Sequence, residues 1–139
     1  MSDKDARELL DHARALIVGA MPGVIAVYVF GSAASGRLTV DSDLDLAVLD
    51  RQPTEPARLY DLTRTLEVAL RVDVDLVDLL TASTVLKKEV IAGGQLIHCA
   101  DKDAVLDFEA RSLSEYGRYR EGMEPLLQAV RETGKAYAI

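Results

Sequence analysis

Aspartates occupy alternate positions in two otherwise apolar segments of this 139-residue chain. The first segment, residues 43–49, reads DLDLAVL, and a similar alternation recurs in residues 71–80, RVDVDLVDLL. Side chains two residues apart on a β-strand point to the same side of the sheet, so Asp43 and Asp45 project together while the intervening leucine projects the other way. The pattern predicts two strands, each with apolar residues on one face and carboxylates on the other.

The remaining apolar residues follow helical or strand spacing. This spacing predicts helices over residues 5–20, 57–70 and 83–94, and strands over residues 24–30 and 95–99. The chain after residue 100 is predicted to be mostly helical, broken into two pieces around Gly117, Gly122 and Pro125. Because helices and strands alternate along the chain, we expect an α/β or α+β fold with helices packed on one side of a sheet.

Length, charge and cysteine content narrow the functions that the chain can have. It is expected to form one domain, residues 1–139, large enough to bury a core without disulfides. Sixteen Lys and Arg against 23 Asp and Glu give a net charge of −7, which argues against a nucleic-acid polymer as partner. One cysteine, a charged N-terminus and the lack of an apolar run of about 20 residues predict a cytoplasmic protein that does not enter a membrane.

A run of small residues lies between the apolar strand and the first acidic strand. Gly31 and Ser32 end the predicted strand, and residues 33–36, AASG, follow. Small residues allow backbone N–H groups to approach an anion closely, so this bend could bind phosphate without a basic side chain. The alternative is a tight turn with no ligand.

Two carboxylates on one face of a strand repel each other, and a cation between them relieves that repulsion. Mg²⁺ fits Asp43 and Asp45 because it prefers a few carboxylates together with waters and substrate phosphates. Asp73 and Asp75 form a second such pair, and one of them could join the first pair if the two strands are neighbours. Three carboxylates can hold two Mg²⁺ ions that bind a nucleoside triphosphate. An isolated pair is more often simply the polar side of a half-exposed strand.

Competing motifs are excluded by particular residues. An EF-hand starting at Asp41 would have glycine where Leu46 stands and glutamate where Gln52 stands. The glycine patterns of P-loop and dinucleotide-binding proteins are absent. His12 and His98 lack the spacing of metal ligands, and the lone Cys99 has no neighbouring base, so structural roles are expected for all three.

The spacing Gly31-Ser32, ten residues, then Asp43-Leu44-Asp45 resembles the signature of the DNA polymerase β-like nucleotidyltransferase superfamily. The short length and the run over residues 74–101 are most similar to minimal nucleotidyltransferases, the MntA-like antitoxins encoded with HEPN-domain toxins. The likeness extends over about residues 7 to 120. It implies an α+β fold with a small mixed sheet flanked by helices, in which a core of about residues 7–100 precedes a helical part of about residues 101–135.

The resemblance also implies an activity and a partner. These antitoxins are Mg²⁺-dependent and transfer AMP from ATP onto a tyrosine of the HEPN toxin, so a hetero-oligomer with the toxin is expected. Carried over by position, Gly31 and Ser32 would hold the triphosphate, and Asp43 and Asp45 would bind the metals. Ser42, next to this pair, could bind a phosphate or a metal-bound water, or could simply be the residue at which the strand begins.

By resemblance, the third carboxylate is Asp75. The run VDLVDL, residues 74–79, has Asp75 as its first aspartate and matches the family strand better than a match centred on Asp73 does. Asp73 shares its face and stays an alternative, while Asp78 should face away. Two other functions stay open: a small-molecule nucleotidyltransferase of the aminoglycoside type, and an antitoxin that acts by binding alone. The aromatic stripe of Phe108, Tyr116 and Tyr119 is either core or a surface for the toxin.

Overall fold

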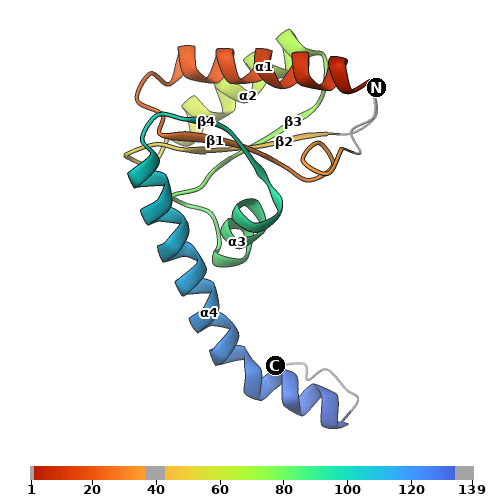
Figure 1. The fold of residues 1–139 in the computed structure, drawn as a ribbon, viewed down its shortest axis with the longest axis vertical. Helices are drawn as coiled ribbons and strands as arrows, with labels where there is room; N and C mark the ends of the chain where they lie inside the picture. The colour runs from red at the N-terminus through yellow and green to blue at the C-terminus, as the bar shows by residue number, and fades with distance from the viewer. Residues whose placement is uncertain (1, 37–42, 134–139) are drawn as a thin grey trace.

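The computed structural model describes residues 2–36 and 43–133. These residues form four helices and four strands, which are interleaved along the chain (Figure 1). In order they are α1 (Asp3–Ala20), β1 (Ala26–Phe30), β2 (Leu44–Leu49), α2 (Pro56–Leu70), β3 (Val74–Asp78), α3 (Thr84–Gly93), β4 (Gln95–Cys99) and α4 (Lys102–Thr133). The fold is α+β, as predicted, and every element lies where the residue spacing predicts one.

The strands form one mixed sheet in the order β3, β2, β1, β4. β1 pairs antiparallel with both β2 and β4, whereas β2 and β3 are parallel and are joined by the crossover helix α2. The start of β2 and the start of β3 therefore lie together at one end of the sheet, beside the end of β1. This topology brings the two acidic segments and the glycine-serine bend to the same place.

Helices cover both faces of the sheet, so the prediction of helices on one side is wrong. α1 and α2 pack on the face that presents Val27 and Val29, and α3 and α4 pack on the face that presents Ala26 and Tyr28 (Figure 1). The reason lies in β1, whose residues are apolar at consecutive positions and are buried up to Val29. Both faces of this strand must be removed from water, which a single helical layer cannot do.

The helix ends follow ordinary capping chemistry. The Ser2 hydroxyl accepts a hydrogen bond from the Asp5 N–H at 3.1 Å, and the Ser83 hydroxyl accepts one from the Leu86 N–H at 3.1 Å. α2 instead begins with Pro56, whose missing N–H costs nothing in the first turn. These caps fix where α1, α2 and α3 begin.

α4 is one continuous helix of 32 residues, so the prediction of two helical pieces is wrong. A glycine inside a helix costs only about 1 kcal/mol of helix stability, and neither Gly117 nor Gly122 interrupts α4. Pro125 also lies inside the helix, and Figure 1 shows α4 changing direction in its last part while the bulk of it extends away from the sheet. In the described part of the chain, no helix combines the length and the hydrophobicity needed to cross a membrane.

Candidate active site

Gly31 and Asp45 are in direct contact at the end of the sheet. Phe30, the last residue of β1, pairs with Asp45 in the antiparallel ladder, so the bend begins beside this carboxylate. Gly31 has φ 67°, and a Cβ added there would overlap the Asp45 carboxylate oxygen Oδ2. Glycine is therefore required both by the backbone conformation and by the close approach of the carboxylate. The two halves of the sequence signature meet in the folded chain.

Asp45 and Asp75 lie opposite each other on neighbouring parallel strands. Adjacent strands are about 4.8 Å apart, so two aspartates in register on one face have their side chains close together. Asp45 is half-buried, and Asp75 and Asp43 are exposed. Burial, and then the negative charges of Asp75 and Asp43, raise the pKa of Asp45 above its ordinary value. The three predicted carboxylates thus act on one another electrostatically.

Asp73 and Asp78 occupy different surroundings from Asp75. Asp73 precedes β3, and its carbonyl accepts a hydrogen bond from the Leu44 N–H at 2.8 Å. Its charge is not among the causes that raise the pKa of Asp45, whereas that of Asp75 is. Asp78 is 5% exposed and faces the other side of the sheet, as predicted. Of the three acids in this segment, Asp75 has the position best suited to join Asp45.

The bend over residues 31–36 consists of successive turns and contains no helix. The Ser35 hydroxyl donates to the Ser32 carbonyl at 3.1 Å, and Gly36, with φ 73°, donates its N–H to the Ala33 carbonyl at 3.3 Å. Ser32 is half-buried at the start of the bend. Ser42, the remaining predicted nucleotide-binding residue, lies outside the described residues.

Gln95 supports the bend, and the sequence analysis missed it. Its side-chain Nε2 donates to the Ala34 carbonyl at 3.3 Å across 61 positions of sequence. The register of β4 on β1, in which Gln95 pairs with Val29, brings the amide to the bend. No local pattern in the sequence signals such a contact, because it depends on the placement of β4 at the edge of the sheet.

The chemistry of this end of the sheet fits a divalent cation. Carboxylate oxygens are the donors that Mg²⁺ prefers. Burial first, and then the charges of Asp75 and Asp43, disfavour the ionised form of Asp45 and raise its pKa. A cation would reverse that effect. Within the described ranges, no three acidic, histidine or cysteine side chains are already arranged as a metal site.

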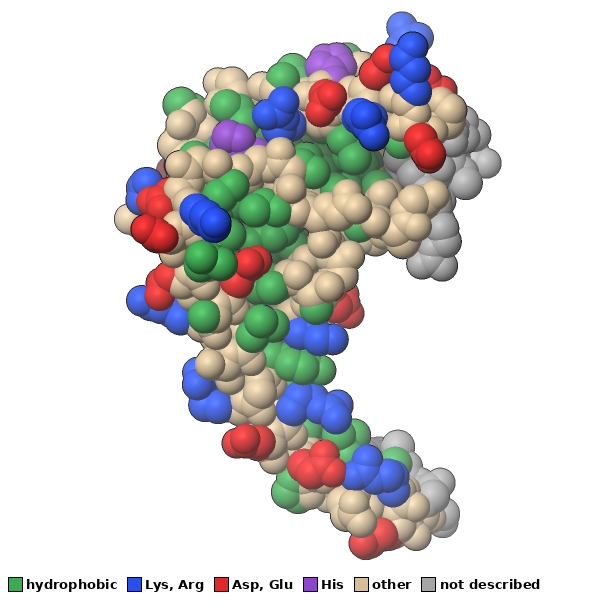
Figure 2. Space-filling model, in the orientation of Figure 1, with side chains coloured by type: hydrophobic (Ala, Val, Ile, Leu, Met, Phe, Trp, Pro, Cys, Tyr) green, Lys and Arg blue, Asp and Glu red, His purple; other side chains and the backbone are tan. Residues whose placement is uncertain are grey.

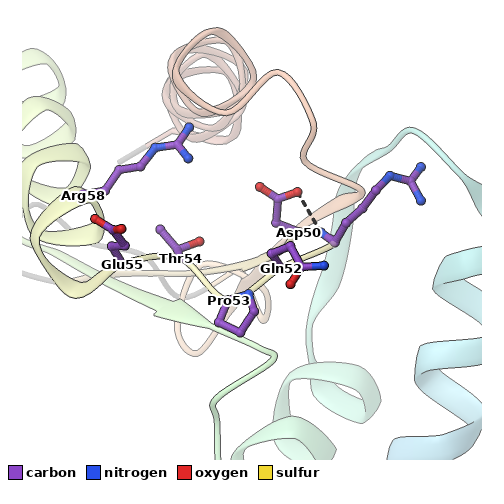
Figure 3. A pocket seen from close by; sticks show the side chains of 7 residues that line it. Asp50, Gln52, Pro53, Thr54, Glu55 and Arg58 are labelled. Atoms are coloured by element: carbon purple, nitrogen blue, oxygen red, sulfur yellow. Dashed lines mark hydrogen bonds between the residues drawn. The ribbon is translucent and has the colours of Figure 1, made fainter.

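A hollow of about 490 Å³ lies at the opposite end of β2 from the acids (Figure 3). It is lined by the loop from Asp50 to Glu55 and by Arg58 of α2. Figure 3 shows Asp50 and Arg58 on different sides of the hollow, with Gln52 and Pro53 pointing away from both. Its polar groups do not converge, so it lacks the arrangement that binds a small ligand.

The sequence and the fold match known nucleotidyltransferases. Residues 17–103 match the family described as polymerase beta, nucleotidyltransferase. Over 96 residues, 69% of this chain and 68% of the relative, the sequence is 36% identical to the protein adenylyltransferase MntA of Shewanella oneidensis.

Two solved structures are similar over most of the chain. One is a toxin–antitoxin complex with AMP-PNP (TM-score 0.79, 30% identity, 87% of this chain and 97% of the other). The second is a tri-AMPylated Shewanella oneidensis HEPN toxin in complex with an MNT antitoxin (TM-score 0.76, 28% identity, 91% and 98%). The chain therefore belongs to the polymerase beta nucleotidyltransferase family, and within it to the minimal nucleotidyltransferases related to MntA.

Proposed function

We propose that this nucleotidyltransferase is an antitoxin that transfers AMP from Mg²⁺-bound ATP to a tyrosine of a partner HEPN-type toxin and so neutralises it. The observation that carries the proposal is the pairing of Asp45 with Asp75 beside Gly31, in a chain related to a protein adenylyltransferase. The similarity to an antitoxin bound to an AMPylated toxin supports the acceptor, and the similarity to a complex with AMP-PNP supports the nucleotide.

In this proposal the bend and the acids have separate tasks. Gly31 and Ser32 bind the triphosphate through the backbone and the hydroxyl of the bend. Asp43, Asp45 and Asp75 bind the Mg²⁺ ions. Magnesium, when bound, would neutralise the carboxylates and the phosphates and so assist attack on the α-phosphate.

The reaction itself is an in-line displacement. The tyrosine oxygen forms a bond to the α-phosphorus, the bond from that phosphorus to the bridging oxygen of the β-phosphate breaks, and pyrophosphate leaves. The phenolic proton passes to the carboxylate cluster and from there to solvent. What the protein supplies is mainly position: the bend holds the triphosphate while the two strands hold the carboxylates at a fixed separation.

The test is a labelling experiment with α-³²P-ATP, Mg²⁺ and a HEPN-type toxin, the product of the adjacent gene if that gene encodes one. We expect label on the toxin with the wild-type protein and none with Asp45→Asn. The control is Asp45→Asn mixed with unlabelled toxin, assayed for neutralisation. Toxin that is neutralised without being labelled would overturn the proposal in favour of an antitoxin that acts by binding alone.

A further inference from the structure

Near its start, α4 packs one apolar face on the rest of the protein. The same face continues into the later part of α4, which extends away from the rest of the protein. Near the start of α4, Val105 is buried and Phe108 packs against the same cluster. Tyr116, Tyr119 and Met123 follow at intervals of three or four residues from this side, which places them on the same face of the helix. We refer to Tyr116, Tyr119 and Met123 as the outer stripe.

α3 reaches Tyr116 but is too short to cover the rest of the outer stripe. Its ten residues span about 15 Å, whereas the 32 residues of α4 span about 48 Å. Where the two helices meet, Thr84 contacts Glu115, Lys87 lies 3.8 Å from Glu115, and Lys88 Nζ lies 5.3 Å from the ring centroid of Tyr116. Thr84, the first residue of α3, lies beside Glu115, so α4 extends beyond the N-terminal end of α3 from about Tyr116 onward.

The two tyrosines of the outer stripe form an aromatic surface. Their ring centroids are 6.3 Å apart with an interplanar angle of 30°, and Tyr119 is 44% exposed. Tyrosine offers a large contact area at a low cost in side-chain entropy and is enriched at protein interfaces. A stacked pair on an extended helix is therefore suited to contact another protein.

The candidate catalytic acid Asp45 lies on the face of the sheet that α3 and α4 cover. Figure 2 shows a hook whose hollow lies between the far part of α4 and the body that contains the sheet. Asp45 shares its face of the sheet with Ala47, and this is the face that α3 and α4 cover. A protein whose side chain reached Asp45 from this side would also lie against α4.

The comparisons separate α4 from the nucleotidyltransferase domain. The family match ends at residue 103, where α4 has just begun. Residues before Lys102 make up less than three quarters of the chain, so similarity to the antitoxins in the two toxin complexes, which covers 87% and 91% of it, must include part of α4. Part of α4 is thus shared with proteins in toxin–antitoxin complexes, although the family match ends where the helix has just begun.

We infer that the outer stripe of α4 is the docking surface for the partner toxin, and that it holds the toxin in the hollow in front of the carboxylates. The inference rests on the proposed function for the identity of this partner. The stripe supplies affinity for the toxin and takes no part in binding ATP.

The test uses the full chain with Tyr119→Glu, and Met123→Glu as a second variant. The matched control is Val68→Glu, which places the same charge at an exposed apolar position, 74% exposed, on α2 at the other face of the sheet. Circular dichroism establishes that each variant is folded. Toxin affinity, the dependence of AMP transfer on toxin concentration, and MgATP affinity are then measured for each protein.

We expect both stripe variants to weaken toxin binding by roughly tenfold or more and to raise the KM for toxin, as the loss of an aromatic interface anchor does. The kcat at saturating toxin and the MgATP affinity should stay unchanged, and Val68→Glu should match the wild type. Wild-type toxin affinity in both stripe variants would overturn the inference. Failure of the wild type to label a toxin that it binds would instead overturn the proposed function and leave the docking surface intact.

Discussion

The two ends of β3 show what the same residue type does in two different surroundings. Asp75, near the start of the strand, is exposed and lies opposite another aspartate. Asp78, at its end, is buried, and its carboxylate accepts hydrogen bonds from the backbone N–H groups of Thr54 and Leu80, both at 2.9 Å. Within the described residues, one end of β3 has neighbouring negative charges, and the other has a carboxylate that accepts two hydrogen bonds.

The difference separates a site from a structural support. Asp78 joins β3 to the loop before α2, so its charge is used in holding the fold together. Burial, and then the charges of Asp75 and Asp43, disfavour the ionised form of Asp45, and the described residues give its carboxylate no comparable hydrogen bond. Side chains that destabilise the protein are expected where they serve binding or catalysis. Four predictions test this contrast, from the largest effect to the smallest.

Replacing Asp75 should affect AMP transfer far more than replacing Asp73. We expect Asp75→Asn to lower kcat by at least about a hundredfold, because a carboxylate that binds the metals is lost. Asp73→Asn should change it by less than about threefold, since Asp73 lies outside the strand. Steady-state labelling of the toxin measures both, and equal losses in the two variants would mean that the third carboxylate is wrongly assigned.

Gly31→Ala should damage the site and the fold together. The added methyl group overlaps the Asp45 carboxylate and forces a left-handed backbone conformation on alanine. We expect a loss of about 1–2 kcal/mol in the free energy of unfolding and a larger loss of MgATP affinity. Urea denaturation and calorimetry measure the two quantities. Gly36→Ala is the control, because Gly36 has a similar φ of 73° but no atom near its Cβ position.

Asp78→Ala should destabilise the protein without altering its chemistry. Two backbone N–H groups lose a charged acceptor, which costs about 2–3 kcal/mol of unfolding free energy. The kcat of the folded fraction should match the wild type, measured at a temperature below the onset of unfolding. A normal melting temperature together with lost activity would reverse the roles assigned to the two ends of the strand.

The smallest effect concerns pH and Asp45. Its pKa is raised in the folded state, so the folded protein binds this proton more tightly than the unfolded chain does. As pH rises above the ordinary value of 3.8, the wild type should therefore lose stability relative to Asp45→Asn. The side chain is partly exposed, which limits the difference to less than about 1 kcal/mol. Melting temperatures in EDTA between pH 4 and 7 measure it, and a wild type that gained stability over Asp45→Asn would contradict the account.

Local patterns in the sequence were sufficient to predict most of the fold. Alternating aspartates and leucines identified β2 and β3, and three- and four-residue spacing identified the helices, because these periods reflect which side of an element is buried. The continuity of α4 departs from the prediction. A glycine such as Gly117 costs only about 1 kcal/mol, and Pro125, which costs about 3 kcal/mol, lies inside α4 in the part where the helix changes direction.

The site required contacts that no local pattern encodes. Alternation placed Asp43 and Asp45 together, but the pairing of Asp45 with Asp75 follows from the parallel register of two strands separated by α2. The contact between Gly31 and Asp45 likewise depends on how β1 pairs with β2. The support that Gln95 gives to the bend is of the same kind.

The most direct test of the central claim is a calorimetric titration of ATP into the wild type and into Asp45→Asn, with Mg²⁺ and with EDTA. If the acids beside Gly31 hold the metal and the bend holds the triphosphate, the wild type should bind ATP with Mg²⁺ and lose at least about tenfold in affinity in EDTA. Asp45→Asn should bind weakly under both conditions. ATP binding that is equally tight in both proteins, with or without Mg²⁺, would contradict the account.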